Sequence, residues 1–575
     1  MQSIQGIDIL STLPFIVVTV FGMLVLMLEV FQREADDRQY LSWVSALGFA
    51  ATALAAFALR YAPGVSTFHG MNYLDGYSLV LTHLFCFAGA ATSLVAPRYL
   101  REHGADRGEF HALLLFAVGG MMLMVSAADF VVLFIALEIM SIAVYALAAY
   151  VRRSAGAAEA GMKYFLLGAF ASAILLYGIA LIYGATGTTN FEGIRAALTS
   201  GGVSAAAVSD TVFEAIQAAA TGASLDDVSA TTPAGLSLAS MGILLVMVAF
   251  AFKIAAVPFH MWAPDAYTGA PTPVVGFMAA AVKAAGVAAL LRLVSVAFFA
   301  EPVRMGMFGW VQIAFGLAML SMIVGNLVAI VQDNVKRMLA YSSVAHAGYL
   351  LVGFVAVGYG VGNINYGSAL VFYLFAYTFA TVGAFGALAW LGRRGHEVER
   401  YEDLNGLGYR YPWIGLVLGI FMLSSAGIPP AAGFIGKFLV FKAAIGAATT
   451  GSAAGFAGSA GLILLVTVGI LVSIAGVYYY LRVIVHLFMK PQEREVVEQP
   501  FSGAKLAIAA CAVLTIVFGL VPGRLIDASD RAVTQMAGRA DGVYMRSERP
   551  APRAEAPLTA PATDPARQLA VVIAD

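Results

Sequence analysis

The stretch "FKIAAVPFHMWAPDAYTGAPTPV" occupies residues 252–274 and follows the apolar run "LSLASMGILLVMVAFA". A lysine, Lys253, and a proline, Pro258, therefore stand at the end of a segment with the hydropathy of a membrane span. Proline lacks a backbone N–H and breaks the regular hydrogen bonding of a helix. Non-helical backbone at membrane depth is tolerated only where it is buried in protein or lines a wet cavity. The stretch therefore predicts a broken helix beside a charged site inside a membrane protein.

The composition of the whole chain supports this interpretation. Of its 575 residues, 60% are hydrophobic and 12% are charged, whereas soluble domains carry about 25% charged residues. The mean hydropathy is +0.84. Apolar runs of 18 or more residues recur, each long enough to cross ~30 Å of hydrocarbon. We predict an all-α polytopic membrane protein, because a membrane β-barrel would show alternating segments of ~10 residues.

Several classes of partner and cofactor are disfavoured. The net charge of −1 gives no indication of a nucleic-acid partner. The two cysteines, Cys86 and Cys511, stand alone in apolar segments, so we expect no iron–sulfur cluster, metal site or disulfide in this chain. The first apolar run lacks a basic leader and is too long for a cleavable signal, so we expect it to span the membrane.

We predict about fourteen transmembrane helices from the apolar runs. Their approximate spans are 10–31, 40–60, 76–96, 109–127, 129–151, 163–187, 236–258, 273–298, 308–331, 336–357, 368–391, 412–446, 459–487 and 505–522. Lysines and arginines concentrate in the odd-numbered loops, so these loops should be cytoplasmic and both termini should lie on the opposite side. Residues 188–235 form a long small-residue loop, part of which, 209–228, could hold a short amphipathic helix.

Ionisable residues inside the predicted helices are the main functional signal. They are Glu138, Lys163, Lys253, Lys283, His346 and Lys437. A charge at the centre of a membrane costs at least ~2.5–3.5 kcal/mol, so the set is plausible only if its members face one another or a wet path. Structural salt bridges are the alternative for any single residue. Arg292, Lys442 and Arg482 lie nearer helix ends, where we expect them to snorkel to the interface.

The chemistry of these ionisable side chains indicates which ion is transported. Sodium requires several oxygen ligands, which lysines do not supply. A lysine can exchange a proton at neutral pH if its surroundings favour the neutral amine by ~4 kcal/mol, and desolvation can supply that much. A neighbouring carboxylate opposes this effect, so movement of Glu138 relative to Lys253 would act as a switch. A proton relay modulated by Glu138 is the favoured hypothesis.

A second break resembles the first. "SSAGIPPAAGFIGKF" places Pro429 and Pro430 in the twelfth predicted helix, shortly before Lys437. The breaks are five helices apart, so helices 4–8 and 9–13 are predicted to be two inverted copies of one unit, with broken helices 7 and 12. In this register His346 corresponds to Glu138. Its use in the relay and a purely structural role remain alternatives.

The predicted division of the chain follows from this repeat. It comprises an N-terminal three-helix segment (1–108), a first five-helix repeat (109–298, including the loop 188–235), a second repeat (299–490), a C-terminal helix (491–522) and a polar tail (523–575). The tail is rich in Ala, Pro, Arg and Glu, and we expect it to be mostly disordered.

Three stretches carry a resemblance to a known family. "FKIAAVPFHMWAPDAYTGAPTPVVGFMAAAVKAAG", "NLVAIVQDNVKRMLAYSSVAHAGYLLVG" and "DLNGLGYRYPWIGLVLGIFMLSSAGIPPAAGFIGKF" resemble the antiporter-like subunits of respiratory complex I, the proton-translocating NADH–quinone oxidoreductase. "YTGAPTPV" and "DLNGLGYRYPW" are similar to the subunit N group. The resemblance covers roughly residues 75–490 and excludes the loop 188–235 and the tail.

The resemblance implies a membrane-arm proton channel in the inner membrane of a bacterium. The family's glutamate on the fifth helix falls on Glu138, and its lysines on the seventh, eighth and twelfth helices fall on Lys253, Lys283 and Lys437. Lys163 matches a further lysine on the sixth helix. FMN, iron–sulfur clusters and quinone are expected in partner subunits, as are the other membrane subunits and the peripheral redox arm. Two alternatives are a subunit of a multi-subunit sodium/proton antiporter and a structural membrane scaffold.

Overall fold

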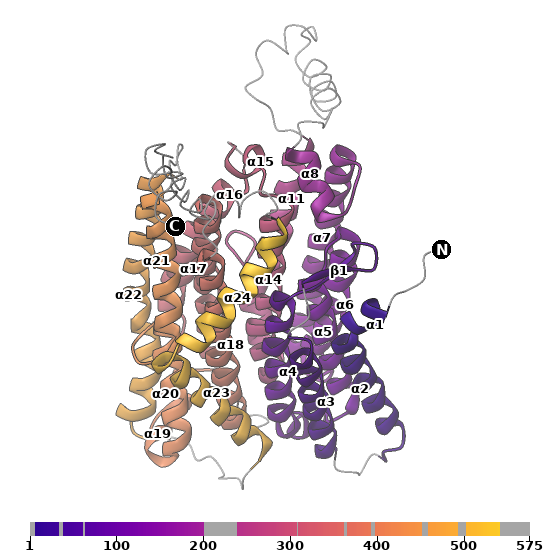
Figure 1. Cartoon of the computed structure of the whole chain (residues 1–575). Coiled ribbons are helices and arrows are strands. Elements are labelled where there is room, and N and C mark those ends of the chain that lie inside the picture. Colours follow the sequence, from indigo (N-terminus) through magenta and orange to yellow (C-terminus); the bar gives the residue numbers. More distant parts are fainter. Residues whose placement is uncertain are drawn as a thin grey trace, which may run out of the picture.

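The computed structural model describes residues 6–33, 38–60, 64–199, 238–306, 309–360, 365–392, 397–450, 458–492 and 502–540. Within these ranges the chain forms a bundle of long helices (Figure 1), thirteen of which are long and apolar enough to cross a membrane. Together with the shorter apolar helix α11, they account for the fourteen helices predicted from the sequence. The predicted polytopic helical fold is confirmed.

The N-terminal segment comprises three of these spans. Its elements are α1 (Gly6–Ser11), α2 (Leu13–Val30), α3 (Gln39–Ala58), the antiparallel strands β1 (Val65–Thr67) and β2 (Asn72–Leu74), and α4 (Gly76–Glu102). Asp75 caps the start of α4, because its side chain accepts a hydrogen bond from the backbone N–H of Ser78. An N-cap of this kind satisfies one of the free amide groups at a helix start. The strands were not predicted.

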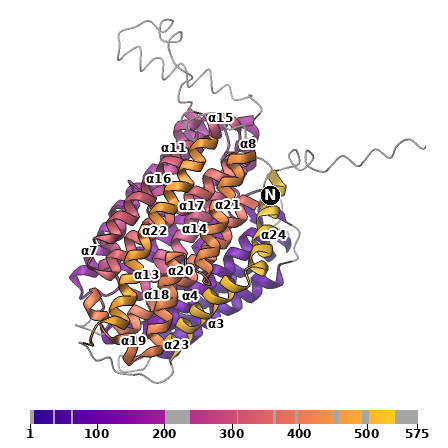
Figure 2. The same cartoon turned by 90° about the vertical axis from the view of Figure 1, so that its left-hand side faces the viewer.

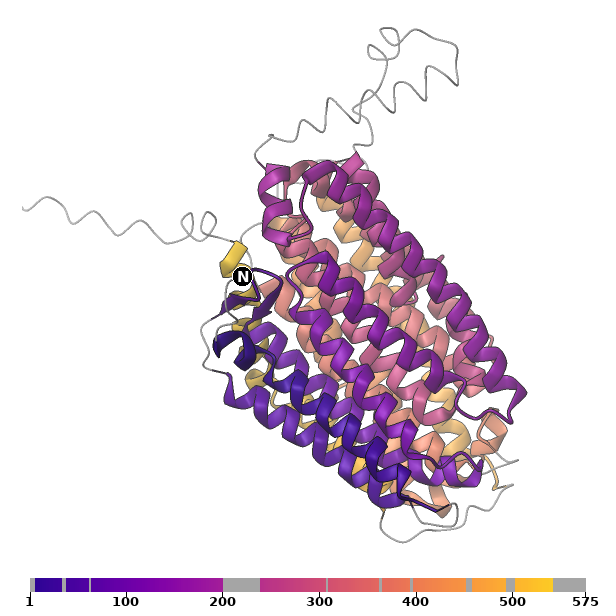
Figure 3. The ribbon, with the colours of Figure 1, turned by 90° about the vertical axis from the view of Figure 1, so that its right-hand side faces the viewer.

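Two five-helix units follow, and each is interrupted at its fourth crossing. The first comprises α5 (Gly108–Ser126), α6 (Phe130–Ala148), α7 (Ala155–Thr186), α11 (Leu238–Lys253) with α12 (Trp262–Gly269), and α13 (Thr272–Phe277), the π-helix η1 (Met278–Val282) and α14 (Lys283–Val296). The second comprises α16 (Trp310–Ile330), α17 (Val335–Tyr359), α18 (Asn365–Leu391), α20 (Pro412–Ala426) with α21 (Ala432–Thr450), and α22 (Ser459–Met489). Figure 2 views the bundle from the side of α21 and α22, and Figure 3 from the opposite side.

Shorter elements complete the described chain. They are α8 (Phe191–Thr199), α15 (Glu301–Met305), the 3₁₀ helix η2 (Tyr401–Leu404), α19 (Leu407–Arg410), α23 (Gly503–Leu520) and α24 (Gly523–Ala540). The loops that are rich in arginine and lysine lie at the end of the bundle that carries α19, the lower end in Figure 1. We call this end the basic side and the other end the opposite side.

Glycines allow the same close helix contact in both units. A Cβ atom on Gly120 of α5 would stand 2.6 Å from the backbone nitrogen of Met140 on α6. A Cβ atom on Gly325 of α16 would stand 2.5 Å from the backbone nitrogen of Ala345 on α17. Neither separation can accommodate a side chain. Small residues let helix backbones approach each other in membranes, where apolar burial gives little drive for association. The two units therefore pack their first two helices in the same way.

Part of the predicted polar tail is ordered. Residues 523–540 form α24, which lies across the other helices (Figure 1). Ala532, Val533 and Met536 are buried on one side of it, and Arg531 is exposed on the other. The carboxamide oxygen of Gln535 accepts a hydrogen bond from the backbone N–H of Gly76 at 2.6 Å. Residues 541–575 and the possible amphipathic helix at 209–228 lie outside the described residues.

A buried ion pair ties the N-terminal segment to α14. The guanidinium of Arg292 donates to both carboxylate oxygens of Asp75, at 2.8 and 2.9 Å, and its Nε donates to the carbonyl of Val125 at 2.6 Å. The side chains are 1% and 0% exposed. The expectation that Arg292 snorkels to the interface is wrong. Bidentate geometry and the third acceptor offset the cost of removing the charges from water.

We expect Asp75→Leu to destabilise the protein by about 3–5 kcal/mol, because it leaves a buried guanidinium without its counter-charge. The double variant Asp75→Leu/Arg292→Met should recover part of the loss. The measurement is the thermal unfolding midpoint of the purified assembly. Asp333→Leu is the control, because Asp333 pairs with Arg482 with its side chain 81% exposed. Equal midpoints for Asp75→Leu and Asp333→Leu would contradict the prediction.

Candidate functional site

Three of the predicted lysines are deeply buried on three different helices. Lys253 is 3% exposed, Lys283 is 1% exposed and Lys437 is 7% exposed. Each ammonium group donates hydrogen bonds to hydroxyl or carbonyl oxygens of the chain. Buried charges persist only when such acceptors replace water. The structure therefore places these lysines inside the protein and away from lipid.

Lys253 is the last residue of α11, where Pro258 and the break at residues 254–261 end the helix. Its ammonium donates to the hydroxyl of Ser141 at 2.8 Å and to the hydroxyl of Tyr145 at 3.0 Å. Both acceptors belong to α6, three and seven residues after Glu138. Residues at this spacing share one face of a helix. The contact therefore brings the seventh crossing onto the face of α6 that carries Glu138.

Glu138 is half-buried, and its carboxylate accepts a hydrogen bond from Ser172 on α7. Among the described residues, no ion pair joins Glu138 to Lys253. The carboxylate and the ammonium are instead separated along α6 by one helical turn, with Ser141 next to the lysine. Opposite charges at such a distance still interact by several kcal/mol where the effective dielectric constant is low. The arrangement keeps them coupled without binding them to each other.

Lys283 begins α14 directly after the π-helix η1. Its ammonium donates to the backbone carbonyl of Ser343 on α17 at 2.6 Å and also to the Ser343 hydroxyl. π-Helical turns often occur at functional sites, because they rotate the following residues relative to a regular helix. A Cβ built on Gly286, one turn after Lys283, would stand 3.7 Å from Cβ of Lys253. Lys253 therefore lies beside α14, at the turn that follows Lys283.

His346 follows Ser343 by one turn on α17 and is 4% exposed. Its Nδ1 lies 2.7 Å from the hydroxyl of Tyr373, and its Nε2 lies 3.1 Å from the hydroxyl of Tyr480. The Tyr480 hydroxyl is also hydrogen-bonded to Ser342. A hydroxyl can donate or accept, so either tautomer of the imidazole fits this setting. His346 is thus connected to hydroxyl groups of α18 and α22.

Lys437 lies beside the second break. Its ammonium donates to the carbonyls of Ser425 and Ala426, at 3.0 and 3.1 Å, and to the hydroxyl of Ser473 at 3.0 Å. Ser425 and Ala426 end α20, where Gly427 adopts a left-handed conformation with φ +83°. The last carbonyls of a helix lack partners within the helix and carry partial negative charge. The break therefore supplies the acceptors that a buried ammonium needs.

One helix joins the later members of the row. Along α17, Ser343 contacts Lys283, His346 follows one turn later, and the ring of Tyr349 lies 4.9 Å from the ammonium of Lys437. Together with the contact between Lys253 and α6, these residues form a row from Glu138 through Lys253, Lys283 and His346 to Lys437. The row crosses both five-helix units through α6, α11, α14, α17 and α21. It brings together five of the six residues singled out in the sequence.

The sixth residue, Lys163, lies apart from this row. Its ammonium pairs with Glu159 at 2.7 Å and with Asp265 at 2.9 Å, and its side chain is 42% exposed. Asp265 also accepts from Arg337 of α17 at 2.8 Å. This surface network connects the two units near the basic side. In the structure Lys163 therefore makes an ionic contact between the two units and lies outside the row.

The sequence reasoning did not identify the hydroxyl partners. These are Ser141, Tyr145, Ser172, Ser343, Tyr373, Tyr480 and Ser473. Ser141 and Tyr145 could have been identified from the sequence, since their spacing places them on the same helix face as Glu138. The others lie on helices distant in sequence, and serine and tyrosine are common in helices of every kind.

A second ionic site on the basic side joins the end of α4, the start of α17 and the loop before η2. Oε1 of Glu397 accepts from the hydroxyl of Tyr99 at 2.8 Å and from Nε2 of His103 at 3.0 Å, and Oε2 accepts from Lys336 at 2.6 Å. Nδ1 of His103 lies 2.7 Å from the carbonyl of Tyr99. Both ring nitrogens therefore face oxygens that only accept, which requires an imidazolium.

The pKa directions agree with this geometry. The hydrogen bond to Glu397 raises the pKa of His103 above 6.5, although burial acts in the opposite direction. Burial acts to raise the pKa of Glu397, but the hydrogen bond from His103 and the charge of Lys336 outweigh it and lower the pKa to about 2. Both pKa shifts favour a protonated His103 beside an ionised Glu397.

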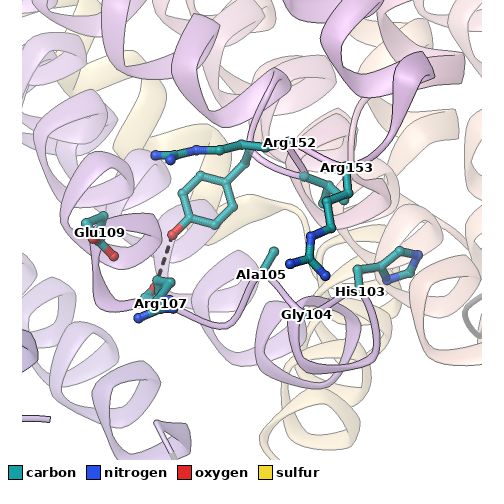
Figure 4. A pocket seen from close by; sticks show the side chains of 9 residues that line it. His103, Gly104, Ala105, Arg107, Glu109, Arg152 and Arg153 are labelled. Carbon is teal, nitrogen blue, oxygen red and sulfur yellow. Dashed lines mark hydrogen bonds between the residues drawn. The ribbon is translucent and has the colours of Figure 1, made fainter. Parts of the chain in front are cut away.

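A polar pocket of about 370 Å³ lies beside this site. Figure 4 shows Arg107, Arg152 and Arg153 around it, with Glu109 to one side. His103 also lines it. The pocket opens at the basic ends of α5, α6 and α7, so water can approach the bundle there. Among the described residues, no group of three His, Cys, Asp or Glu side chains is placed to hold a metal ion.

Comparisons with known proteins agree on one family. Residues 127–464 match the family described as NADH:quinone oxidoreductase/Mrp antiporter, TM. The chain is 39% identical to NADH-quinone oxidoreductase subunit N of Trichlorobacter lovleyi over 92% of its own length and 98% of that relative. It is 41% identical to subunit N 1 of Sorangium cellulosum over 90% and 97% of the two chains.

Solved structures show the same fold. A chain of respiratory complex I from Thermus thermophilus is 32% identical and superposes with a TM-score of 0.69, over 90% of this chain and 100% of that one. A chain of the Mrp complex from Dietzia sp. superposes with a TM-score of 0.69 at 20% identity, over 94% and 99% of the two chains. The second likeness concerns the fold alone.

We expect Ser141→Ala/Tyr145→Phe to destabilise the protein by about 1–3 kcal/mol or more, because it leaves the buried Lys253 ammonium without acceptors. The measurement is the thermal unfolding midpoint. Tyr150→Phe, just beyond the end of α6, is the control, since its hydroxyl makes one exposed hydrogen bond to the Arg107 carbonyl at 3.3 Å. A loss no greater than that of the control would contradict this assignment of acceptors.

The His103–Glu397 site should make stability depend on pH. A group with a raised pKa stabilises the fold fully below its unfolded pKa, and this contribution is lost as the pH rises through the folded pKa. We therefore expect His103→Gln to cost about 1–3 kcal/mol at pH 6, the value of a charged hydrogen bond, and progressively less by pH 9. A cost that stays constant over this range, in thermal unfolding midpoints, would show that His103 is not charged.

The Glu397 carboxylate should make the stability of the protein depend on pH under acidic conditions. Its contribution is present above its unfolded pKa near 4.5 and is lost as the pH falls toward the folded value of about 2. The same unfolding series extended from pH 5 to pH 3 should therefore show the parent losing its advantage over Glu397→Gln.

Proposed function

Because the chain belongs to the NADH:quinone oxidoreductase/Mrp antiporter family and aligns along its length with subunit N relatives, we propose that it carries protons across the membrane in the membrane arm of an NADH–quinone oxidoreductase. The observation that carries the proposal is the row of buried ionisable groups from Glu138 to Lys437. Ionisable residues inside membrane proteins mark ion and proton pathways. Here each one is paired with groups that can exchange protons.

In this proposal each member of the row has a role. Lys253 takes up a proton from the basic side, Lys283 and His346 pass it across the middle of the bundle, and Lys437 releases it toward the opposite side. Glu138 sets the proton affinity of Lys253 through charge, since one helical turn separates the two groups. The hydroxyls of Ser141, Tyr145 and Tyr480 give the proton hydrogen-bonded intermediate positions. Lys163 braces the two units near the proton entrance.

The acceptors around the lysines favour protons over sodium as cargo. Lys253 and Lys437 are hydrogen-bonded to neutral hydroxyl and carbonyl oxygens, and each presents an ammonium group that repels a metal cation. A sodium site needs several oxygens without a competing cation. A lysine in the same setting gains or loses a proton when the neighbouring charge changes.

The driving energy comes from partner subunits. Moving one proton against 150–200 mV costs about 3.5–4.6 kcal/mol from the electrical difference alone. The oxidation of NADH and the reduction of quinone supply it, with FMN, iron–sulfur clusters and quinone bound by other subunits and no redox centre in this chain. Glu138 is half-buried on α6, and Ile135 and Ile142, one turn before and after it, are 52% and 61% exposed. This face contacts a neighbouring membrane subunit, whose charge state Glu138 senses.

The orientation follows from the distribution of charge. The basic side is cytoplasmic, because positively charged loops are retained in the cytoplasm during insertion. Both ends of the chain then lie on the far side of the bacterial inner membrane. Protons enter near Asp265 and Lys163 and leave beyond Lys437.

The test separates a proton relay from a structural scaffold. Lys253→Arg keeps the positive charge, but arginine cannot release a proton in a protein. We expect the assembled variant to pump protons at least about tenfold more slowly, in keeping with the loss of one proton-transfer group. Lys253→Ala and Glu138→Gln should also impair pumping. The measurement is NADH-driven acidification in vesicles, normalised to the assembled complex.

One control variant accompanies this measurement. Lys442→Arg lies on the same helix as Lys437 at an exposed position and should pump normally. Normal pumping by Lys253→Arg and Glu138→Gln would refute the relay and favour a scaffold. Pumping that depends on sodium, in complexes without quinone reductase subunits, would favour the sodium/proton antiporter.

A further inference from the structure

A second pocket on the basic side lies at the membrane-facing surface, away from the relay. Its volume is about 350 Å³, and its walls come from four helices. Trp43 belongs to α3, Arg98 and Arg101 to α4, Trp390 to α18 and Gly503 to α23. Pockets of this size accommodate small ligands or headgroups. Its position at the ends of four spans places it at the boundary between hydrocarbon and water.

Aromatic residues mark the same boundary. Trp43 is 45% exposed, and the rings of Trp390 and Trp413 lie 4.9 Å apart with the ammonium of Lys505 within 5.8 Å of both. Tryptophan gathers at the level of lipid headgroups, because its ring is apolar and its N–H is polar. The pocket is therefore level with the phosphates of the surrounding lipids.

The polar wall of the pocket is cationic. Nε of Arg98 donates to Glu102 at 2.9 Å and Nη1 donates to the carbonyl of Trp390 at 3.0 Å, but Nη2 has no hydrogen-bond partner. Arg101, one turn away, is 50% exposed, and its Nε lies 3.6 Å from Oδ2 of Asp106. The pocket itself is lined by two arginines and one carboxylate, that of Glu102. The exposed guanidinium of Arg101 is suited to a phosphate oxygen, and Arg98 adds a second positive charge to the wall.

Apolar stripes lead from the pocket along the bundle. On α3, Leu47 and Leu54 continue the helix face of Trp43 and are 62% and 67% exposed. On α23, Leu506 and Val513 follow Gly503 and are 44% and 59% exposed. Exposed stripes of this kind provide contact area for acyl chains directly beneath the headgroup level.

We propose that this pocket binds the phosphodiester headgroup of an anionic phospholipid, with Arg98 and Arg101 holding the phosphate and its acyl chains lying against α3 and α23. The pocket in Figure 4 contains more arginines, but Arg152 and Arg153 are exposed loop residues, and no tryptophan or leucine of the described chain lines it. It has the charge but lacks the apolar path. The site on α3, α4, α18 and α23 has both.

The test measures lipid binding to the delipidated, assembled complex by native mass spectrometry. The probes are phosphatidylglycerol, phosphatidylcholine and inorganic phosphate. We expect Arg101→Gln to weaken phosphatidylglycerol binding about fivefold and Arg98→Gln/Arg101→Gln about 25-fold, the effect of one and two basic residues at an anionic surface. Because Arg101 is half-exposed, its single variant tests the site without disturbing the contacts of Arg98.

Control variants localise the effect. Arg410→Gln removes an exposed arginine from the same side and should leave binding within twofold. If Arg152→Gln/Arg153→Gln weakened phosphatidylglycerol binding equally, the lipid would bind in the pocket of Figure 4, and the proposal would be overturned. Equal binding of phosphatidylcholine, displacement of the lipid by inorganic phosphate at the same concentration, or unchanged binding in the double variant would overturn it as well.

Discussion

A lysine ammonium inside a membrane protein must find oxygen acceptors within the protein, and the rest of this structure depends on that requirement. In hydrocarbon each unsatisfied charge costs several kcal/mol. Most carbonyls of a regular helix are already engaged within the helix, so hydroxyl groups and helix ends supply most of the acceptors. The chain meets the requirement by ending helices at the right depth. The carbonyls that end α20 receive Lys437, and the break after α11 lets Lys253 reach Ser141 and Tyr145 on another helix.

The repeat explains why these acceptors fall into a row. Each unit contributes one broken crossing and one close helix pair, and glycine permits the pair in both units, at Gly120 and at Gly325. The two breaks occupy corresponding crossings of the two inverted units. α17 lies between them and carries Ser343, His346 and Tyr349 at successive turns. In the proposed relay, the groups that carry the proton from one half of the protein to the other lie on this single helix.

Ionic contacts outside the row hold it in place. Arg292 and Asp75 fix α14, which begins with Lys283, to the N-terminal segment. Glu397 joins the loop after α4 to the start of α17 on the basic side, and Asp265 joins α7 to α17. A relay that responds to charge requires such a frame, because a shift of a few ångströms changes the interaction between two charges by kcal/mol. These ion pairs restrict movement of the surrounding helices, so that the charged residues of the row are the groups that shift.

The sequence by itself determined the membrane class, the helix count, the two breaks and the buried ionisable residues, because hydropathy and helix-breaking residues act locally. Tertiary structure alone decided which charges meet. Arg292 and Lys163 illustrate the limit: both are basic residues in predicted helices, yet one is buried against Asp75 and the other lies on the surface beside Glu159. The hydroxyl partners on α7, α17, α18 and α22 could not be predicted either. Which side chains pair depends on how helices distant in the sequence pack, and the sequence around a residue does not specify which helix will contact it.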